Sequence, residues 1–313
     1  MEQNIGQDHP ESVPHWASFF AIDEYAAFDK AVQGYFRSLG KPYKLDGGTI
    51  RTNWMNKDSD MQNLGLLNIA QLCKSATKEQ YPDIVRNHFE VMRKSQDFIS
   101  GFFDTMDDFD FVKPFIGTRV YHRDHLQSLG PGGVISHRIT DDLIGILVFD
   151  MPQAITSVKP DQINVWGRSA AELIQLGLQN IRENYTFEVQ ELKARVPLKA
   201  VVQNHFFASN VIMELERYPE LLGTHGTLVT VPHRHSVVFH PIEDITIIMA
   251  INMMVPMTRA MFKDGPGSIS DKIYWYRRGE LVLLPYKFVD DQMQFEPPQD
   301  FLDMMNYFSK EAD

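Results

Sequence analysis

Residues 143–149 read Leu143-Ile144-Gly145-Ile146-Leu147-Val148-Phe149, an apolar run with an aspartate at each end. A continuous apolar run of this length is typical of a central strand that is covered on both faces. Residues 155–158 are expected to form a second strand, and the leucine spacing of residues 169–185 predicts an amphipathic helix. Strand, strand and helix in this order indicate an α+β protein.

On the N-terminal side of this run, residues 22–39 are predicted to form an amphipathic helix. Its apolar residues recur at spacings of three or four, and they are Tyr25, Phe28, Val32 and Phe36. Asp23 is expected to cap this helix and Gly40 to end it. The pair Asp46-Gly47 predicts the turn of a hairpin over residues 41–52, because both residues tolerate a positive φ.

The remaining elements are predicted from the same periodicities. Helices are expected at residues 61–75, 79–102, 206–222, 244–262 and 300–308, and extended chain at 111–121, 227–239 and 272–288. Pro256 is expected to kink or stop the helix that contains it, and Arg278-Gly279 should form the turn of the last hairpin. The predicted fold is therefore α+β, with mixed or mainly antiparallel sheets and helices packed on one side.

A hexapeptide occurs twice. Leu64-Gly65-Leu66-Leu67-Asn68-Ile69 matches Leu176-Gly177-Leu178-Gln179-Asn180-Ile181 at five of six positions. Both copies are predicted to lie in helices that follow strand pairs, which suggests a repeated β-β-α unit; the alternative is a chance match between leucine-rich helices. Because glycine inside a helix costs about 1 kcal/mol relative to alanine, Gly65 and Gly177 predict close approach of a neighbouring backbone.

The strongest signal for a loop in the sequence is the glycine- and proline-rich segment Leu129-Gly130-Pro131-Gly132-Gly133. We place a domain edge there, which divides the chain into a flexible N-terminal arm, residues 1–20, and two α+β subdomains, residues 21–130 and 131–313.

Composition narrows the class of protein. The chain has 30 Lys+Arg and 41 Asp+Glu, a formal net charge of −11, which opposes binding to nucleic acid and to anionic membranes. Cys73 has no possible partner for an intrachain disulfide, which fits a reducing compartment. The first residues show no secretory signal, and the longest apolar stretch, residues 245–257, is shorter than the roughly 20 residues of a membrane span. We therefore expect a cytoplasmic protein.

The sharpest candidate for chemistry is Val231-Pro232-His233-Arg234-His235, which continues to His240. In a strand, His233 and His235 point to the same side, so with a third ligand they could bind Zn²⁺ or Fe²⁺. His240 could supply that ligand if the chain turns, as could His225 or Glu243. The alternative is a polar strand end that contacts the acidic surface of the protein.

Other polar motifs are more simply explained by structure. His122 and His125 would share a helix face beside Asp124, and Asp141-Asp142 and Asp290-Asp291 are expected at turns. A solvated linker explains the acidic cluster, which comprises Asp104, Asp107, Asp108 and Asp110. The sequence contains no serine nucleophile elbow and no phosphate-binding glycine loop.

A pliable apolar helix is a candidate surface for a partner. Its methionines are Met253, Met254, Met257 and Met261, and thioether side chains adapt to varied partners. Tyr274 and Trp275, followed by Arg277 and Arg278, could add stacking and cationic contacts. The alternative is that the methionines fill the core and that the hairpin buries one face.

Several short motifs also occur in a set order between about residues 50 and 300. They are residues 64–69, 81–85, 112–116, 147–150, 171–173, 179–181, 231–238 and 270–276. In this order they resemble the YtpQ-like family of uncharacterised bacterial proteins. The resemblance implies a bacterial cytoplasmic α+β protein, and it carries over no reaction and no catalytic residue.

We therefore expect a non-enzymatic intracellular binding or adaptor protein without a cofactor, which engages a protein partner or a second copy of itself. The acidic surface suits a basic partner. One alternative is a metal-dependent, hydrolase-like enzyme built on His233, His235 and a third ligand. Another is a small-ligand sensor with a pocket between subdomains.

Overall fold

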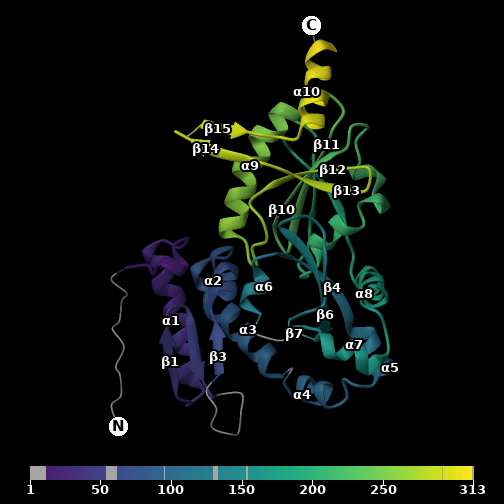
Figure 1. Ribbon diagram of the computed structural model, residues 1–313. Helices are drawn as coiled ribbons and strands as arrows, with labels where there is room; N and C mark the ends of the chain where they lie inside the picture. Colours follow the sequence, from purple (N-terminus) through teal and green to yellow (C-terminus); the bar gives the residue numbers. More distant parts are fainter. Residues whose placement is uncertain are drawn as a thin grey trace. The chain divides into compact units, whose positions relative to one another are not determined.

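The computed structural model describes residues 12–53, 62–94, 96–129, 133–152, 154–290 and 292–311. Helices and antiparallel sheets alternate along the chain, so the predicted α+β class is confirmed (Figure 1). By their internal contacts the residues form two compact units. The first runs to Phe103 and includes short pieces at residues 152–154 and 264–266, and the second contains the remaining residues.

The first unit packs helices on a three-stranded antiparallel sheet. Its elements are η1 (His15–Ala17), α1 (Ile22–Ser38), β1 (Tyr43–Asp46), β2 (Thr49–Thr52), β3 (Gln62–Gly65), α2 (Leu67–Lys74), η2 (Lys78–Gln80), α3 (Tyr81–Lys94) and α4 (Gln96–Asp104). The spacing predicted for α1 is confirmed, because Phe28, Val32 and Phe36 are buried in the core of this unit. Ala17 and Phe20 are buried there too, so this part of the predicted N-terminal arm is packed; residues 1–11 lie outside the described residues.

Local details of the first unit differ from the prediction. The hairpin turn consists of Gly47 and Gly48, both with positive φ, because Asp46 pairs with Thr49 in the ladder. Asp23 does not cap α1. Instead, the Glu24 carboxylate accepts a hydrogen bond from the Ala21 backbone N–H at 2.7 Å.

The two copies of the repeated hexapeptide occupy different positions in the fold, and the repeated β-β-α unit stays a prediction. Gly65 is the last residue of β3, where it pairs with Thr49, so the helix predicted from residue 61 was wrong in its first turn. The second copy lies wholly inside α8 (Ala170–Asn184). The same residues thus form a strand–helix junction at one site and helix interior at the other, because tertiary context outweighs local propensity.

The second unit contains a sheet around β6 (Leu143–Met151), which is buried along nearly its whole length, as the apolar run predicted. β4 (Ile116–His122) and β5 (Ser136–Arg138) pair with β6 antiparallel, and β7 (Ala154–Ser157) also pairs with it. The surrounding helices are α5 (Phe109–Val112), η3 (Lys113–Phe115), α6 (His125–Ser128) and α7 (Pro160–Trp166). α8 packs on β4 and begins with a capping box between Ser169 and Glu172.

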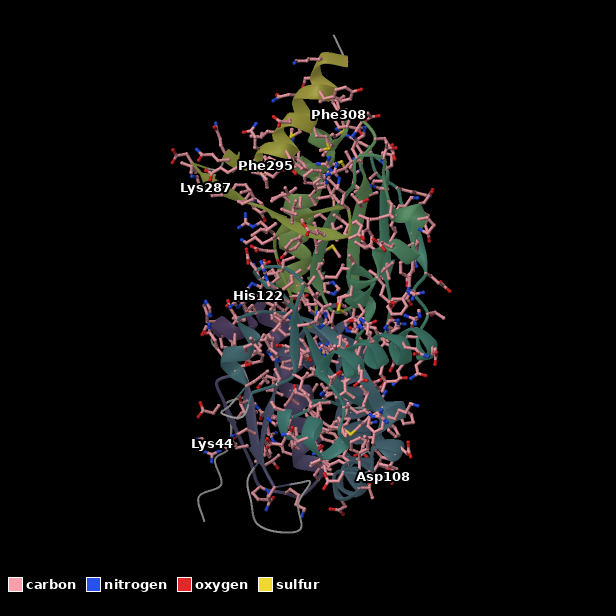
Figure 2. The ribbon with its side chains drawn as sticks, turned by 45° about the vertical axis from the view of Figure 1, so that its right-hand side comes forward. Lys44, Asp108, His122, Lys287, Phe295 and Phe308 are labelled. Carbon is pink, nitrogen blue, oxygen red and sulfur yellow. The ribbon has the colours of Figure 1, made fainter. Side chains whose placement is uncertain are left out.

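A six-stranded antiparallel sheet forms the rest of this unit. Its order is β13 (Glu280–Leu284), β12 (Ile273–Arg277), β10 (Thr227–His233), β11 (Ser236–Pro241), β9 (Leu198–Val202) and β8 (Val189–Leu192). α9 (Ile247–Asp264) and α10 (Gln299–Glu311) cover one face. Three short 3-10 helices cover the other face: η4 (Ala208–Met213), η5 (Leu215–Arg217) and η6 (Pro219–Leu221). β14 (Tyr286–Val289) and β15 (Gln292–Phe295) form a hairpin, and Figure 2 shows Phe295 on it and Phe308 on α10.

One helix prediction in this unit needs correction, because residues 206–222 form the 3-10 helices instead of one α-helix. α9 does not stop at Pro256, and the predicted alternative of a kink there stays a prediction. The predicted domain edge at residue 130 stays a prediction, since residues 130–132 lie outside the described part. Within the described residues, no helix combines the length and the apolarity that crossing a bilayer requires.

Candidate functional site

Two buried arginines of the second unit form the candidate site. Arg119 lies in β4 and is 9% exposed, and Arg234 lies in the turn between β10 and β11 and is 7% exposed. The Arg234 backbone N–H donates to the Gly267 carbonyl at 3.1 Å. A Cβ at Gly267 would lie 2.7 Å from Arg234 Cδ, so the glycine leaves space for this side chain to pass.

Aromatic rings hold both guanidinium groups. Arg119 Cζ lies 4.7 Å from the ring centroid of Tyr121 and 5.9 Å from that of Phe206. Arg234 Cζ lies 4.4 Å from the Phe206 centroid. The Phe206 ring is therefore within cation–π range of both cations, and it places them in one cluster.

Neither arginine has a carboxylate partner within ion-pair distance among the described residues. Arg119 Nε is buried and makes no hydrogen bond to any described residue. Burial lowers the pKa of Arg119, and burial together with the positive charge of Arg119 lowers the pKa of Arg234 to about 10. Cation–π contacts contribute about 0.5–2 kcal/mol, whereas desolvating an ion costs several kcal/mol. The rings therefore do not offset the burial of two cations.

Imidazoles surround the pair without supplying negative charge. Arg234 Nε donates to His235 Nε2 at 3.0 Å, so the ring of His235 carries its proton on Nδ1, which lies 3.1 Å from the Gln203 carbonyl oxygen. His233 Nδ1 accepts from the His235 backbone N–H, which leaves the His233 proton on Nε2. Burial and the charge of Arg234 lower the pKa of each ring to about 4. Both are thus neutral near pH 7.

The imidazole of His125 also lies beside these residues. His125 stacks on Tyr121 with ring centroids 4.4 Å apart and planes within 4°. Burial, followed by the charge of Arg119, lowers the pKa of His125. The cluster of Arg119, Arg234 and their neighbouring imidazoles, here called the arginine cluster, therefore combines fixed positive charge with the neutral rings of His233 and His235. Such a combination can bind an anion.

The predicted metal ligands do not converge. The rings of His233 and His235 lie 6.2 Å apart, but Nε2 of His235 is engaged by Arg234. His240 is buried in β11, and its Nδ1 lies 2.7 Å from the Pro197 carbonyl oxygen. In the described part of the chain, no three His, Cys, Asp or Glu side chains are grouped to hold a metal. The metal hypothesis therefore stays a prediction that lacks a third ligand.

The predicted partner surface lies largely in the core. Met254, Tyr274 and Trp275 are buried at 0–1% exposure, so in the folded unit they cannot contact a partner as predicted. Met253, Met257 and Met261 are half-buried against the same core. The reason is that α9 covers the six-stranded sheet with its methionine face. The outward face of this helix carries Ile248 and Met249 instead.

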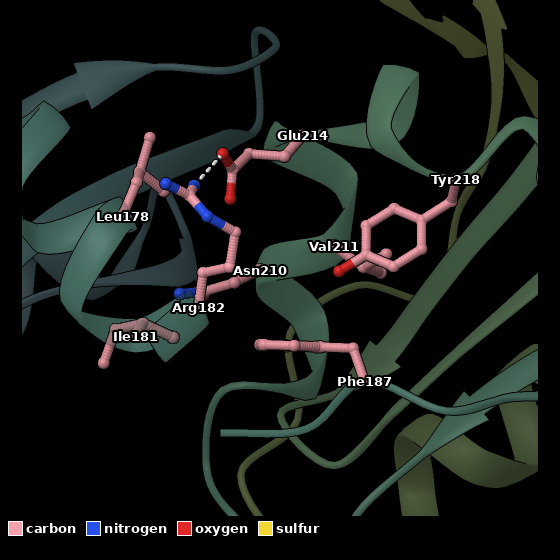
Figure 3. Close-up of a pocket in the computed structure, with 8 residues that line it drawn as sticks. All are labelled: Leu178, Ile181, Arg182, Phe187, Asn210, Val211, Glu214 and Tyr218. Atoms are coloured by element: carbon pink, nitrogen blue, oxygen red, sulfur yellow. Dashed lines mark hydrogen bonds and ion pairs between the residues drawn. The ribbon is translucent and has the colours of Figure 1, made fainter. Parts of the chain in front are cut away.

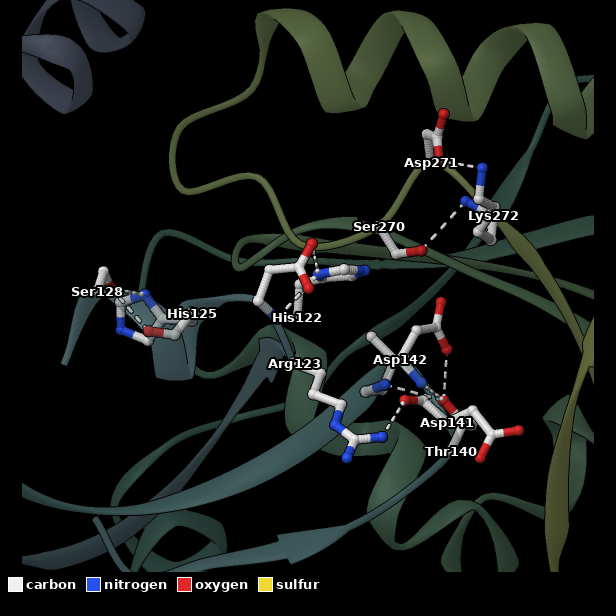
Figure 4. Close-up of polar contacts among 12 residues, drawn as sticks. His122, Arg123, His125, Ser128, Thr140, Asp141, Asp142, Ser270, Asp271 and Lys272 are labelled. Carbon is white, nitrogen blue, oxygen red and sulfur yellow. Dashed lines mark hydrogen bonds and ion pairs between the residues drawn. The ribbon is translucent and has the colours of Figure 1, made fainter. Parts of the chain in front are cut away.

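The polar motifs form local contacts (Figure 4). His122 Nδ1 lies 3.4 Å from a carboxylate oxygen of Asp124, and His125 contacts Ser128. Asp142 accepts hydrogen bonds from Thr140 and from the buried Tyr274 hydroxyl, both at 2.6 Å. Asp108 of the acidic cluster caps α5. The pair Asp290-Asp291 is described only at Asp290, which has a positive φ of 47°.

An ion pair beside a small cavity has a structural explanation. Arg182 of α8 pairs with Glu214 beside a cavity of about 10 Å³, which Leu178, Asn210 and Tyr218 help to line (Figure 3). That volume holds about one water molecule. Here a half-buried arginine has its carboxylate, in contrast to Arg119 and Arg234.

Sequence reasoning found His233 and His235 but missed Arg119 and Phe206. The available signal was a charged residue at position 119 inside an otherwise uncharged strand, Ile116-Gly117-Thr118-Arg119-Val120-Tyr121. Comparison of the chain with protein-family models, curated proteins and solved structures found no match. The resemblance to the YtpQ-like family therefore stays a prediction, and the function has to be argued from the site.

Proposed function

We propose that the protein binds a small dianionic oxyanion between Arg119 and Arg234. The observation that carries the proposal is the burial of two adjacent guanidinium groups without a carboxylate from the described residues. An uncompensated buried charge is strongly destabilising. A ligand that brings two negative charges to the cluster would remove this cost.

The arrangement favours an oxyanion over other anions. A guanidinium offers several N–H donors in a planar fork, which matches the oxygen geometry of phosphate, sulfate and carboxylate groups. Tyr121 and Phe206 hold the guanidinium groups by cation–π contacts, and Arg234 Nε donates to His235. The other guanidinium N–H groups are the donors that this proposal assigns to the ligand. His233 can donate through Nε2. Two cations and a neutral donor fit a doubly charged ligand better than a monocarboxylate.

This proposal refines the expectation of a non-enzymatic binding protein. The arginine cluster supplies fixed charge and neutral imidazoles, which are features of recognition. Binding of the predicted protein partner remains a separate proposal, because a protein docks on an exposed surface and not on a buried charge.

Isothermal titration calorimetry with inorganic phosphate and with sulfate, in chloride of constant ionic strength, tests the proposal. We expect one site per chain, with acetate binding at least tenfold more weakly than either dianion. Losing a charged hydrogen bond costs about 1.5–3 kcal/mol, so Arg119→Gln and Arg234→Gln should each weaken phosphate binding at least tenfold. Circular dichroism checks that both variants fold.

The matched control is Arg217→Gln. Arg217 belongs to the same unit but is half-exposed and paired with Glu214, so this variant should bind phosphate as the wild type does. If the wild type binds neither dianion, or if the control loses as much affinity as the two buried-site variants, the proposal is wrong.

A further inference from the structure

A cavity of about 730 Å³ in the second unit runs along the free edge of a sheet. Glu280, Leu281, Val282 and Leu283 of β13 all line it. Successive side chains of a strand point to opposite faces. A cavity that touches all four residues therefore follows the edge of the strand, and does not lie over one face of the sheet.

The backbone groups of this edge are open. β13 is the terminal strand of the six-stranded sheet and pairs only with β12 among the described strands. The two-residue turn Arg278-Gly279 closes on the pair Arg277–Glu280, so hydrogen-bonded positions alternate from there. Leu281 and Leu283 consequently direct their N–H and C=O groups away from β12 and towards the cavity.

Residues of a second terminal strand also line the cavity. His137 and Arg138 of β5, followed by residues 139–141, line the cavity, and β5 is the terminal strand of its own sheet. Ile212 and Met213 of η4, Tyr276 of β12 and Gly279 of the turn complete the lining. The lining thus combines residues of two terminal strands with apolar side chains of η4.

Acidic side chains outnumber arginine and lysine side chains among the residues that line the cavity. Arg138 is paired with Asp141 at 2.5 Å, which leaves the exposed Glu280 without a basic partner among the described residues. Burial lowers the pKa of His137, which disfavours a positive charge on this ring. The chain as a whole carries a net charge of −11.

We propose that this groove docks an extended segment of a partner protein, with alternating basic and apolar residues, as an added strand along β13. Added strands are recognised through main-chain hydrogen bonds, while pockets for alternate side chains give specificity. The free groups of Leu281 and Leu283 supply the hydrogen bonds. Glu280 selects basic side chains, and the apolar side chains of Ile212 and Met213 accept the neighbouring apolar residues of the segment.

Fluorescence anisotropy with four synthetic probes tests the proposal. The first is a Lys-Val-Lys-Val-Lys-Val peptide, and the second replaces its lysines by glutamates. The third and the fourth are the lysine peptide N-methylated at alternate backbone nitrogens, one for each edge of the extended peptide. We expect the lysine peptide to bind at one site. The glutamate peptide and the version methylated on the docking edge should each bind at least tenfold more weakly.

Glu280→Lys should weaken binding of the lysine peptide at least tenfold. The matched control is Glu191→Lys, which makes the same exchange on β8, the opposite terminal strand of the same sheet, and should leave binding unchanged. Equal binding of all methylated peptides, or no binding of the lysine peptide, would overturn the proposal. Sedimentation showing a wild-type dimer that Glu280→Lys dissociates would also overturn it, because a second copy would then occupy the edge.

Discussion

The two kinds of arginine in the second unit allow a direct comparison at the scale of single residues. Arg182 meets Glu214 and thereby balances its charge, as buried or half-buried ions usually do. Arg119 and Arg234 are more deeply buried and face each other's positive charge. The free protein therefore carries a cost at this site that a bound anion would relieve.

Replacing Arg119 by methionine should stabilise the free protein. Methionine keeps much of the side-chain volume while removing the unpaired charge, so we expect the free energy of unfolding to rise by about 1–3 kcal/mol in buffers without polyvalent anions. Urea unfolding measures this change. Arg182→Met is the control and should destabilise, since it leaves Glu214 with one fewer partner; a loss of stability in both variants would contradict the prediction.

Stability should fall as the pH drops from about 6.5 to about 4. Within that window an unfolded His233 binds a proton, whereas the folded ring, with a pKa of about 4, does not. The unfolded state thus gains protons and is favoured, by at most about 1.4 kcal/mol per pH unit for one ring. The observed slope should be smaller because solvent partly reaches the imidazole.

Urea unfolding at pH 5 and pH 7 tests this dependence. His233→Asn should lower the slope, and the control His15→Asn, at an exposed position of the first unit, should leave it unchanged. An identical slope in His233→Asn would show that other groups cause the dependence. Arg234 and Arg119 are the charged groups nearest to these rings, and both remain protonated in this pH window.

At the scale of elements, the two glycines of the repeated hexapeptide show what local sequence can predict. A Cβ at Gly177 would lie 2.8 Å from the backbone carbon of Gly117 and 2.6 Å from Thr118 Oγ1, so close backbone approach is confirmed there. A Cβ at Gly65 would meet no atom of the other described residues within 4 Å beyond its chain neighbours, and the residue is in a strand. The sequence shows a glycine at each of the two positions, but it does not show whether a neighbouring backbone requires one there.

Gly177→Ala should therefore destabilise the protein. Alanine favours a helix by about 1 kcal/mol, but overpacking typically costs about 1–3 kcal/mol, and backbone atoms of β4 cannot move as a flexible side chain can. We expect a net loss of about 1–2 kcal/mol in urea unfolding. Gly34→Ala in α1 is the control, because that site is open and exposed, and it should gain up to about 1 kcal/mol. A gain at both positions would contradict the close packing of α8 on β4.

Elements whose burial follows one period were predictable. α1, β6 and the hairpin of β12 and β13 follow from residue spacing and turn residues alone. Residues 206–222 were not, because apolar spacings of three and four do not distinguish an α-helix from successive 3-10 turns. Tertiary contacts decide this segment: Asn210 donates to the Thr118 carbonyl of β4. The arginine cluster was unpredictable for the same reason, since Arg119, Phe206 and Arg234 come from three separate segments.

At the scale of the whole molecule, the hydrophobic cores follow the division into units. The core around Phe36 and Phe89 contains only residues of the first unit, and the cores around Leu228 and around Phe239 contain only residues of the second. Proteins with several domains commonly depart from a single two-state transition, because each hydrophobic core can unfold on its own. We therefore expect two thermal transitions in calorimetry.

Phosphate should raise the midpoint of one transition only, because a ligand stabilises the unit that binds it. Phe36→Ala should lower the midpoint of the other transition, since truncating a buried phenylalanine costs about 3–5 kcal/mol. Phe239→Ala, at an equally buried position of the second unit, is the matched variant and should lower the phosphate-sensitive transition. If phosphate raised both midpoints equally, or if either variant lowered both, the units would unfold together. The anion site would then stabilise the entire chain, and the separate cores would not correspond to separate folding units.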